Sequence, residues 1–547
     1  MKSKRLTLSV LFVVAAVANA LACTNLIVGK NASADGSTIV SYSADSYGLF
    51  GELYHYPAGM HKKGVLIDIH EWDTGKYLGK IEQARQTYNV IGNMNEFQLT
   101  IGETTFGGRP ELVDTTGIID YGSLIYLGLQ RSRTAREAIK VMTELVQEYG
   151  YYSSGESFTI ADPNEIWIME MIGKGPGVRG AVWVAVRVPD DCISAHANQS
   201  RIHQFDMNDK NNCMYSPDVI SFAREKGYFD GVNKDFSFAN AYAPLDFGAR
   251  RYCEARVWSY FNMFTARGNE FLPYILGDTD TPMPLFVKPN RKVSVQDVKN
   301  AMRDHYEGTP LDISKDFGAG PYHTPYRLSP LSFKVDDQEY FNERPISTQQ
   351  SGFVFVAQMR SELPDPIGGV LWFGTDDANM TVFTPVYCCT DKVPVCYTRV
   401  DGADYITFSW NSAFWIFNWV ANMVYPRYDL MMDDVRATQT ELETTFNEAQ
   451  EGVEAAAAKL LEKDPAKAKA FLTNYTNITA QSTFDTWKRL GEFLIVKYND
   501  GVVKRMKNGQ FERNSIGQPA GVIRPGYPKE FLEEYVKQTG DRYKIPE

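Results

Sequence analysis

The chain has 547 residues, of which 44% are hydrophobic and 13% aromatic, so it can bury a large core and form two or more domains. Its formal net charge of −11 argues against nucleic acid or an anionic membrane as a partner. The seven histidines form no motif of a Cys–His pair or a zinc protease, and the cysteine spacing does not suggest zinc, so we expect no cofactor.

The first 22 residues predict a signal peptide. Two lysines and an arginine open the chain, an apolar run follows at 6–17, and an Ala-Leu-Ala sequence ends at Ala22, which is the pattern that signal peptidase reads. The apolar run is too short to cross a bilayer, where ~20 apolar residues are needed. Cleavage after Ala22 makes Cys23 the first residue of an exported protein, periplasmic or extracellular, which no longer has a membrane segment.

Short strands dominate the region that follows. Residues 24–29 and 38–43 predict two strands around a turn, so the mature chain is expected to open with a β-hairpin-like unit. An amphipathic helix is predicted from Thr134 to Tyr149, with Thr134 and Glu137 as a capping box and Gly150 as its stop. Further strands are expected at 88–94, 98–103, 157–161, 166–171, 182–187 and 192–197.

The second half of the chain begins with a region rich in loops, at 198–350. Farther along the chain, an aromatic segment at 409–425 contains three asparagines, which favours a buried core helix over a membrane span. The mixture of elements predicts an α+β layered architecture. Strands are expected at 352–359, 369–373 and 381–385, and helices at 435–462, from there to about 475, and at 487–498.

A mature N-terminal cysteine places two reactive groups on one residue. A thiol has a reference pKa of ~8.5 and an α-amine one of ~7.7–8.0, so the amine can accept the thiol proton near neutral pH. The thiolate can then attack an amide carbonyl, and the protonated amine can protonate the leaving nitrogen. From the residues alone, two other interpretations of Cys23 stay open: a lipidated terminus, and a structural thiol or half of a disulfide.

Six further cysteines remain if Cys23 is a free nucleophile. An even number in an exported protein permits disulfides, and Cys396 is close enough in sequence to Cys388 or Cys389 for a small bridged loop. Buried free thiols are an equally good interpretation. The six are Cys192, Cys213, Cys253, Cys388, Cys389 and Cys396.

The segment from Cys23 to Thr38, CTNLIVGKNASADGST, resembles the opening of the dipeptidase A family of cysteine peptidases, and segments 94–109, 165–170 and 188–202 resemble the family in the same order. These proteins are N-terminal-nucleophile hydrolases with an αββα sandwich, related to penicillin V acylase and bile salt hydrolase. The resemblance is continuous to about residue 202 and patchier beyond. It implies a domain of this α+β type at 23–425, followed by a mainly helical C-terminal extension at 426–547.

The resemblance also implies roles for single residues. Cys23 matches the family nucleophile, and Asp45 resembles the acid that holds the terminal amine, although a turn residue would look the same. Asn198 matches the asparagine that binds the amine and the substrate, with a strand cap as the alternative. Thr105 stands where the acylases have an oxyanion-hole asparagine, so its hydroxyl or a backbone N–H would have to replace that donor.

Two positions are less well determined. Either Arg251 or Arg256 resembles the arginine that steadies the site, and a surface salt bridge is the alternative for both. Many relatives have an arginine where this chain has Tyr42. A neutral phenol cannot lower the thiol pKa as a guanidinium can, which puts the substrate in doubt rather than the reaction class.

The function implied by the resemblance is that of a secreted dipeptidase, which hydrolyses dipeptides or short peptides through an acyl-enzyme on Cys23. A small peptide substrate is the one expected partner, and the sequence does not indicate an oligomeric state. Two alternatives stay open, because composition does not measure the length of a pocket. One is an amidase that acts on N-acyl amino acids or bile conjugates, and the other is a non-catalytic binding protein that retains the fold.

Overall fold

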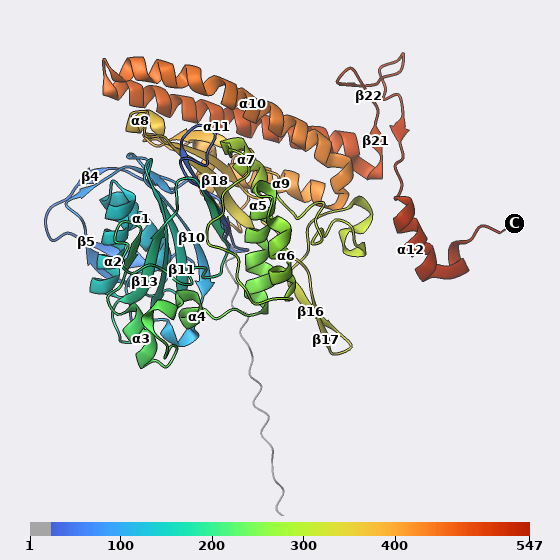
Figure 1. The fold of residues 1–547 in the computed structure, drawn as a ribbon. Coiled ribbons are helices and arrows are strands. Elements are labelled where there is room, and N and C mark those ends of the chain that lie inside the picture. The colour runs from blue at the N-terminus through green and yellow to red at the C-terminus, as the bar shows by residue number, and fades with distance from the viewer. Residues whose placement is uncertain (1–22, 547) are drawn as a thin grey trace, which may run out of the picture.

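The computed structural model describes residues 23–546 (Figure 1). The predicted signal peptide lies outside these residues. Two antiparallel sheets form the centre of the molecule. The six-stranded sheet has the order β14 (Ile193–His196), β1 (Asn25–Val28), β2 (Thr38–Asp45), β18 (Ser351–Met359), β19 (Val370–Thr375) and β20 (Thr384–Tyr387). The eight-stranded sheet has the order β15 (Cys213–Tyr215), β13 (Ala181–Arg187), β12 (Ile166–Gly173), β11 (Gly155–Ala161), β10 (Thr100–Gly107), β9 (Met94–Asn95), β8 (Val90–Ile91) and β3 (His55–Tyr56).

Helices cover the outer face of each sheet, which gives a helix–sheet–sheet–helix order (Figure 1). Helices α1 (Tyr121–Arg131) and α2 (Ala135–Tyr149) pack on the eight-stranded sheet. Helices α9 (Ala413–Val424), α10 (Tyr428–Leu461) and α11 (Pro465–Tyr498) pack on the six-stranded sheet. Because both faces of the central strands are covered, every residue of β1, β2, β11, β12 and β18 is buried. The α+β class and the helical C-terminal region are confirmed, whereas the N-terminal-nucleophile type stays a prediction.

The predicted β-hairpin-like opening is confirmed, because β1 pairs antiparallel with β2. The predicted helix at 134–149 is α2, which begins after Thr134 and ends before Gly150. The Thr134 side chain accepts a hydrogen bond from the backbone N–H of Glu137, as expected of a cap. The Glu137 carboxylate, however, accepts from the N–H of Arg133 rather than from that of Thr134, so only half of the capping box forms.

One prediction about helices is wrong. The helices expected to end near 475 and to resume at 487 are one continuous helix, α11. The intervening stretch is rich in Thr and Asn but has neither Gly nor Pro, and burial of Thr476, Thr479 and Thr483 against the rest of the molecule outweighs their modest helix propensity. The region 198–350 is rich in loops, as predicted, and its helices are short: α3 (Val219–Glu225), α4 (Phe238–Tyr242), α5 (Ala255–Phe264), α6 (Gly268–Leu276) and α7 (Val295–Ala301).

Small elements complete the described chain. Hairpins and short pairs are formed by β4 (Gly59–Met60) with β7 (Gln86–Thr87), β5 (Leu66–His70) with β6 (Tyr77–Glu82), β16 (Ser332–Val335) with β17 (Gln338–Phe341), β21 (Val503–Lys504) with β24 (Val522–Ile523), and β22 (Met506–Lys507) with β23 (Gln510–Phe511). The short helices α8 (Asp365–Gly368) and α12 (Lys529–Thr539) lie in the C-terminal half. Within residues 23–546, no helix has the length and apolar character to cross a bilayer. All seven cysteines are free thiols, so Cys396 forms no bridge.

Helix α11 also meets the edge of the six-stranded sheet. The backbone N–H of Tyr387, at the end of edge strand β20, donates to the Thr476 hydroxyl over 3.3 Å. Farther along α11, Trp487 stacks on Phe417 of α9 with ring centroids 4.8 Å apart. The helix is therefore tied both to the strand edge and to its neighbouring helix.

Close packing between α9 and α11 requires a glycine at position 491. A Cβ at Gly491 would lie 2.2 Å from the Trp419 ring, whereas one at Gly452, on the exposed side of α10, would meet nothing within 4 Å. We expect Gly491→Ala to destabilise the fold by about 1–3 kcal/mol through overpacking. Gly452→Ala should stabilise it by up to about 1 kcal/mol, because alanine is the better helix former. Thermal unfolding of both variants checks this, and equal shifts would contradict the packing.

A buried histidine joins the two sheets. His196 of β14 makes hydrogen bonds to the Thr104 hydroxyl (2.7 Å, Nδ1) and the Thr159 hydroxyl (2.6 Å, Nε2), which belong to β10 and β11 of the facing sheet. Burial, with a smaller contribution from the charge of Arg201, lowers the pKa of His196 from 6.5 to about 3. The imidazole is therefore neutral in the folded protein at every pH above this value.

This histidine should make the fold sensitive to acid. Because the folded pKa lies below the unfolded one, the unfolded chain binds a proton first, and stability falls as the pH drops from 6.5 towards 3. We expect His196 to account for a loss of about 2 kcal/mol between pH 7 and pH 5. Thermal unfolding at both pH values should show a smaller loss in His196→Gln. The exposed His70→Gln serves as the control, and the same pH response in the two variants would refute the assignment.

Candidate active site

Cys23 lies where the central strands of the six-stranded sheet end. It directly precedes β1, and its neighbour Thr24 pairs through the backbone with Ser43 of β2. Strand β2 ends at Asp45, which pairs with Ser351 at the start of β18. Because neighbouring strands are antiparallel, the start of β1, the end of β2 and the start of β18 lie side by side, at the same end of their strands. Only 2% of Cys23 is exposed.

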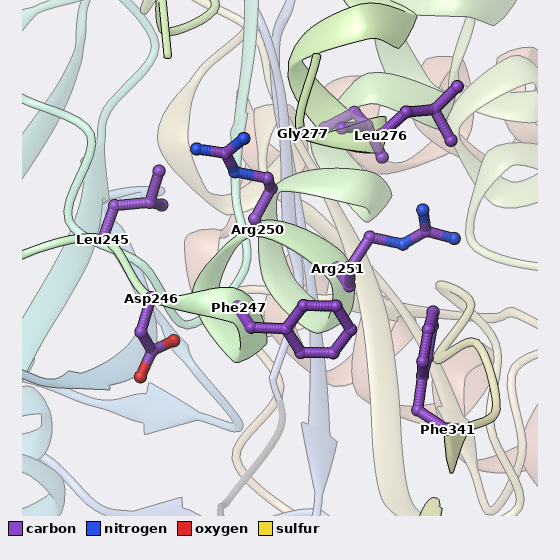
Figure 2. Close-up of a pocket in the computed structure, with 9 residues that line it drawn as sticks. Leu245, Asp246, Phe247, Arg250, Arg251, Leu276, Gly277 and Phe341 are labelled. Atoms are coloured by element: carbon purple, nitrogen blue, oxygen red, sulfur yellow. The ribbon is translucent and has the colours of Figure 1, made fainter. Parts of the chain in front are cut away.

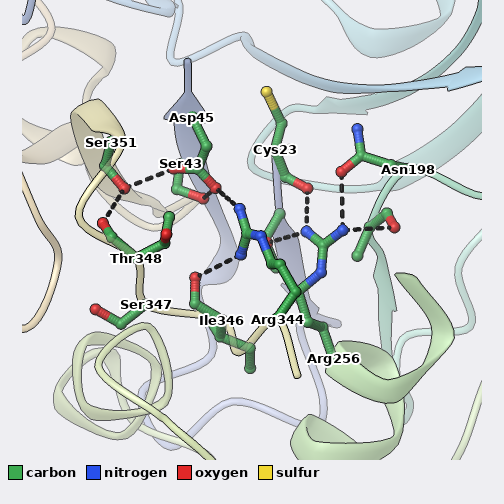
Figure 3. A network of polar contacts seen from close by, with 12 residues as sticks. Cys23, Ser43, Asp45, Asn198, Arg256, Arg344, Ile346, Ser347, Thr348 and Ser351 are labelled. Atoms are coloured by element: carbon green, nitrogen blue, oxygen red, sulfur yellow. Dashed lines mark hydrogen bonds and ion pairs between the residues drawn. The ribbon is translucent and has the colours of Figure 1, made fainter. Parts of the chain in front are cut away.

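Arg256 of α5 connects the residues before β1 to those after β14 (Figure 3). Its Nη1 donates to the carbonyl oxygen of Cys23 and to the Thr24 hydroxyl, both over 2.7 Å. Its Nη2 donates to the carbonyl oxygen of Ala197 over 3.1 Å and to Asn198 Oδ1 over 2.9 Å. Burial, and next the charge of Arg344, lowers the pKa of Arg256 to about 10, so the guanidinium is still charged at neutral pH.

Asp45 is fully buried and belongs to a second group of polar contacts beside Cys23 (Figure 3). Its carboxylate accepts hydrogen bonds from Arg344 Nη2 over 2.5 Å, from Ser351 over 2.6 Å and from Ser43 over 3.0 Å. A buried carboxylate keeps its charge when it is paired and hydrogen-bonded in this way. The structure thus places the predicted Asp45 beside the nucleophile, held by three donors.

Asn198 follows β14 and faces Cys23 from the other side. Its φ of +63° lies in the left-handed region, which asparagine tolerates better than most residues. Besides accepting from Arg256, its side chain donates from Nδ2 to the carbonyl oxygen of Thr105 over 2.8 Å. Thr105, in turn, donates its hydroxyl proton to Glu156 over 2.6 Å. That hydroxyl has only one proton, so in this arrangement it is not available for the predicted oxyanion role.

The sulfur of Cys23 has the hydroxyl of Tyr42 as its nearest polar side-chain contact, at 3.7 Å. Tyr42 donates to Glu103 over 2.6 Å. Burial raises the pKa of the Cys23 thiol well above its ordinary value, and the charges of Glu103 and Asp45 raise it further. Hydrogen bonds from the backbone of Asp45 and from Tyr42 act in the opposite direction. The thiol therefore needs a base in direct contact to lose its proton near neutral pH.

The structure brings Arg256, and not Arg251, to the nucleophile. Arg251 forms an ion pair with Glu343 and packs on the Phe341 ring. It lines a pocket of about 490 Å³ together with Asp246, Phe247 and Arg250, and its side chain points towards Phe341 (Figure 2). Arg251 lies in a π-helical turn, Ala249–Glu254, that precedes α5, whereas Arg256 lies within α5 itself. Of the two arginines that the sequence left open, Arg256 is therefore the one that contacts Cys23, and Arg251 does not.

Three further residues of the site were not expected from the sequence. Glu103 and Glu156 are charged residues inside strands that are otherwise buried, and charged residues are rarely fully buried without a reason, so their positions carried a usable signal. Arg344 gave no such signal in the sequence, because it lies in an irregular segment 299 residues after its partner Asp45. Among residues 23–546, no cluster of His, Cys, Asp and Glu could hold a metal ion.

Comparison with known proteins identifies the same kind of relatives, and the match covers most of the chain. The model of a family described as Peptidase family C69 matches residues 22–56 and 50–441. A protein named probable dipeptidase, from Salmonella dublin, is 31% identical over 389 residues, which cover 67% of this chain and 81% of that protein. Dipeptidase A of Lactobacillus helveticus is 24% identical over 417 residues, which cover 72% of this chain and 80% of the relative.

The buried pair of Asp45 and Arg344 yields a prediction about stability. Asp45→Asn removes the negative charge that faces the Arg344 guanidinium, and breaking a buried ion pair typically costs about 3–5 kcal/mol. Asp68→Asn is the matched control, because its partner Lys80 and Asp68 itself are each 52% exposed, and it should cost less than about 1 kcal/mol. Thermal unfolding should separate the two variants by several degrees. Equal unfolding midpoints for the two variants would show that the buried pair does not stabilise the end of β2.

Proposed function

Since the chain belongs to peptidase family C69, we propose that it is a cysteine dipeptidase that hydrolyses dipeptides or short peptides through an acyl-enzyme on Cys23. The observation that carries this proposal is the position of Cys23, whose carbonyl oxygen is held by Arg256 while its sulfur lies beside Tyr42 and Asp45. The names of the relatives, probable dipeptidase and dipeptidase A, supply the substrate class.

The base for the reaction is the nitrogen of Cys23 itself. In the full-length chain this nitrogen belongs to a peptide bond and has no basic lone pair. Removal of residues 1–22 converts it to an amine with a reference pKa of ~7.7–8.0, two bonds away from the carbon that carries the sulfur. We therefore propose that signal peptidase creates the catalytic group, and that the protein is exported to the periplasm or the exterior. The residue pattern of this segment is the support for both steps.

The reaction then proceeds in two stages. The amine takes the thiol proton, the sulfur forms a bond to the peptide carbonyl carbon, and the C–N bond breaks as the ammonium group returns a proton to the leaving nitrogen. Water then attacks the thioester, giving its proton to the amine and releasing a carboxylic acid and the free thiol. Burial makes an unpaired thiolate costly here, and transfer of the proton to the neighbouring amine pairs the thiolate with an ammonium group.

Arg256 and Asn198 act as positioning residues in this mechanism. The guanidinium fixes the Cys23 carbonyl and the Asn198 side chain relative to each other, which limits the directions in which the terminal amine can point. Such fixed geometry lowers the barrier because the reacting groups need no further search. Asp45, held by Arg344, supplies a negative charge beside the amine that favours its protonated form once the proton has moved.

The central test is loss of the thiol from the mature protein. We expect Cys23→Ala to abolish dipeptide hydrolysis, whereas Cys192→Ala, which removes a buried thiol at the start of β14, should retain it. Intact mass and N-terminal sequencing of the active protein should show that it begins at Cys23. Full turnover by Cys23→Ala, or activity in a form that retains Ala22, would contradict the mechanism. Turnover of N-acyl amino acids without dipeptide turnover would favour the amidase alternative.

A further inference from the structure

Two carboxyl groups are buried next to the nucleophile and have no place in the mechanism above. Glu103 of β10 and Glu156 of β11 are 1% and 0% exposed. Thr105 pairs directly with Glu156 across the two strands, and Glu103 stands two residues before Thr105 on the same face, so the two glutamates are diagonal neighbours. One hydroxyl, that of Tyr42, separates Glu103 from the sulfur of Cys23.

Each carboxyl group has one oxygen that is bonded and one that is not. Glu103 Oε1 accepts from the Tyr42 hydroxyl, and Glu156 Oε1 accepts from the Thr105 hydroxyl. The second oxygen of each group, Oε2, is buried and accepts no hydrogen bond from an N–H or hydroxyl group of the described residues. The two carboxyl groups lie close enough to share one proton between them. Burying two carboxyl groups side by side is costly unless a proton or a cation lies between them. Burial raises the pKa of both groups, which means that each carboxyl group favours a bound proton over a bare negative charge.

The charge of Glu103 also works against the nucleophile, because it raises the pKa of the Cys23 thiol. A cation bound between Glu103 and Glu156 would cancel this charge at the moment when the thiol must lose its proton. The nearby acids strengthen the requirement, since Asp45 acts on Glu103 and Asp73 acts on Glu156 in the same direction. The acidic surroundings of the two glutamates thus favour a positive group beside them.

A peptide with a free amino terminus carries such a group at the right distance. Its ammonium nitrogen is two bonds from the carbonyl carbon of the first residue, and attack requires the sulfur to lie within ~3–3.5 Å of that carbon. The Tyr42 hydroxyl is 3.7 Å from the sulfur and 2.6 Å from Glu103. When the carbonyl is placed at the sulfur, an ammonium group turned towards Tyr42 approaches Glu103, and Glu156 is the diagonal neighbour of Glu103 on the next strand.

We propose that Glu103 and Glu156 form the subsite that binds the free α-ammonium group of the first residue of the substrate. The inference rests on the proposed function, and it names the residues that make the enzyme specific for peptides with a free amino terminus. An N-acylated substrate brings a neutral amide to the same place. It leaves the two carboxyl groups without a cation and the thiol with its raised pKa.

The test compares Ala-Ala with propionyl-alanine, which has the same shape but lacks the ammonium group. We expect the wild type to prefer Ala-Ala by at least a hundred-fold in kcat/KM. Glu156→Gln keeps the acceptor for Thr105 and offers an N–H to Glu103, so it should fold, but it removes one charge. This variant should reduce the preference at least ten-fold, mainly through the KM of Ala-Ala, while turnover of propionyl-alanine stays within about two-fold.

The matched control is Asp162→Asn, which removes a buried carboxylate that caps backbone N–H groups at the far end of β11. It should leave the preference unchanged. An unchanged preference in Glu156→Gln, or an equal change in Asp162→Asn, would overturn the subsite while dipeptide hydrolysis by the wild type still supports the proposed function.

Binding provides a readout that does not depend on turnover. In mature Cys23→Ala, calorimetry should show Ala-Ala binding at least ten-fold more tightly than propionyl-alanine, and this difference should disappear when Glu156→Gln is added. If the wild type hydrolyses neither compound, the proposed function fails, and the binding difference alone decides the subsite. Equal affinities for the two compounds in Cys23→Ala would refute it.

Discussion

The buried guanidinium of Arg256 is the constraint on which the site depends. A charge in a low-dielectric interior must be surrounded by acceptors, and Arg256 finds them on two segments that are far apart in sequence: Cys23 and Thr24 before β1, and Ala197 and Asn198 after β14. The position of the nucleophile is thus set by α5, which follows it by 233 residues. Strands β1 and β14 and helix α5 have to fold together before this set of contacts can form.

The parts that the sequence predicted well are those with a local cause. The opening strands and helix α2 with its cap at Thr134 follow from periodicity and turn residues. The parts that were missed depend on tertiary contacts. Helix α11 runs through a Thr-rich stretch because packing on the six-stranded sheet buries part of it. Arg256 rather than Arg251 contacts Cys23 because only Arg256 lies on α5, which the residues alone did not reveal.

Positively and negatively charged side chains lie on different sides of the Cys23 sulfur. Arg256 and Arg344 lie on the side of the chain terminus, where they hold a carbonyl and the carboxylate of Asp45. Glu103 and Glu156 lie on the side of the eight-stranded sheet, reached through Tyr42. A dipole of this kind orients any zwitterion that enters, and it makes the reactivity of the thiol depend on what is bound. The replacement of an arginine by Tyr42 fits this division, since a phenol can connect the sulfur to an acid without adding a positive charge.

The contact between Thr476 and the backbone of Tyr387 has a consequence for the molecule as a whole. The last strand of an open sheet exposes unpaired amide groups, which can recruit a strand from another chain. In this protein a helix side chain occupies one of them, and α11 lies over the strand that would otherwise grow. The C-terminal helices therefore protect this edge of the sheet against pairing with a strand of another molecule.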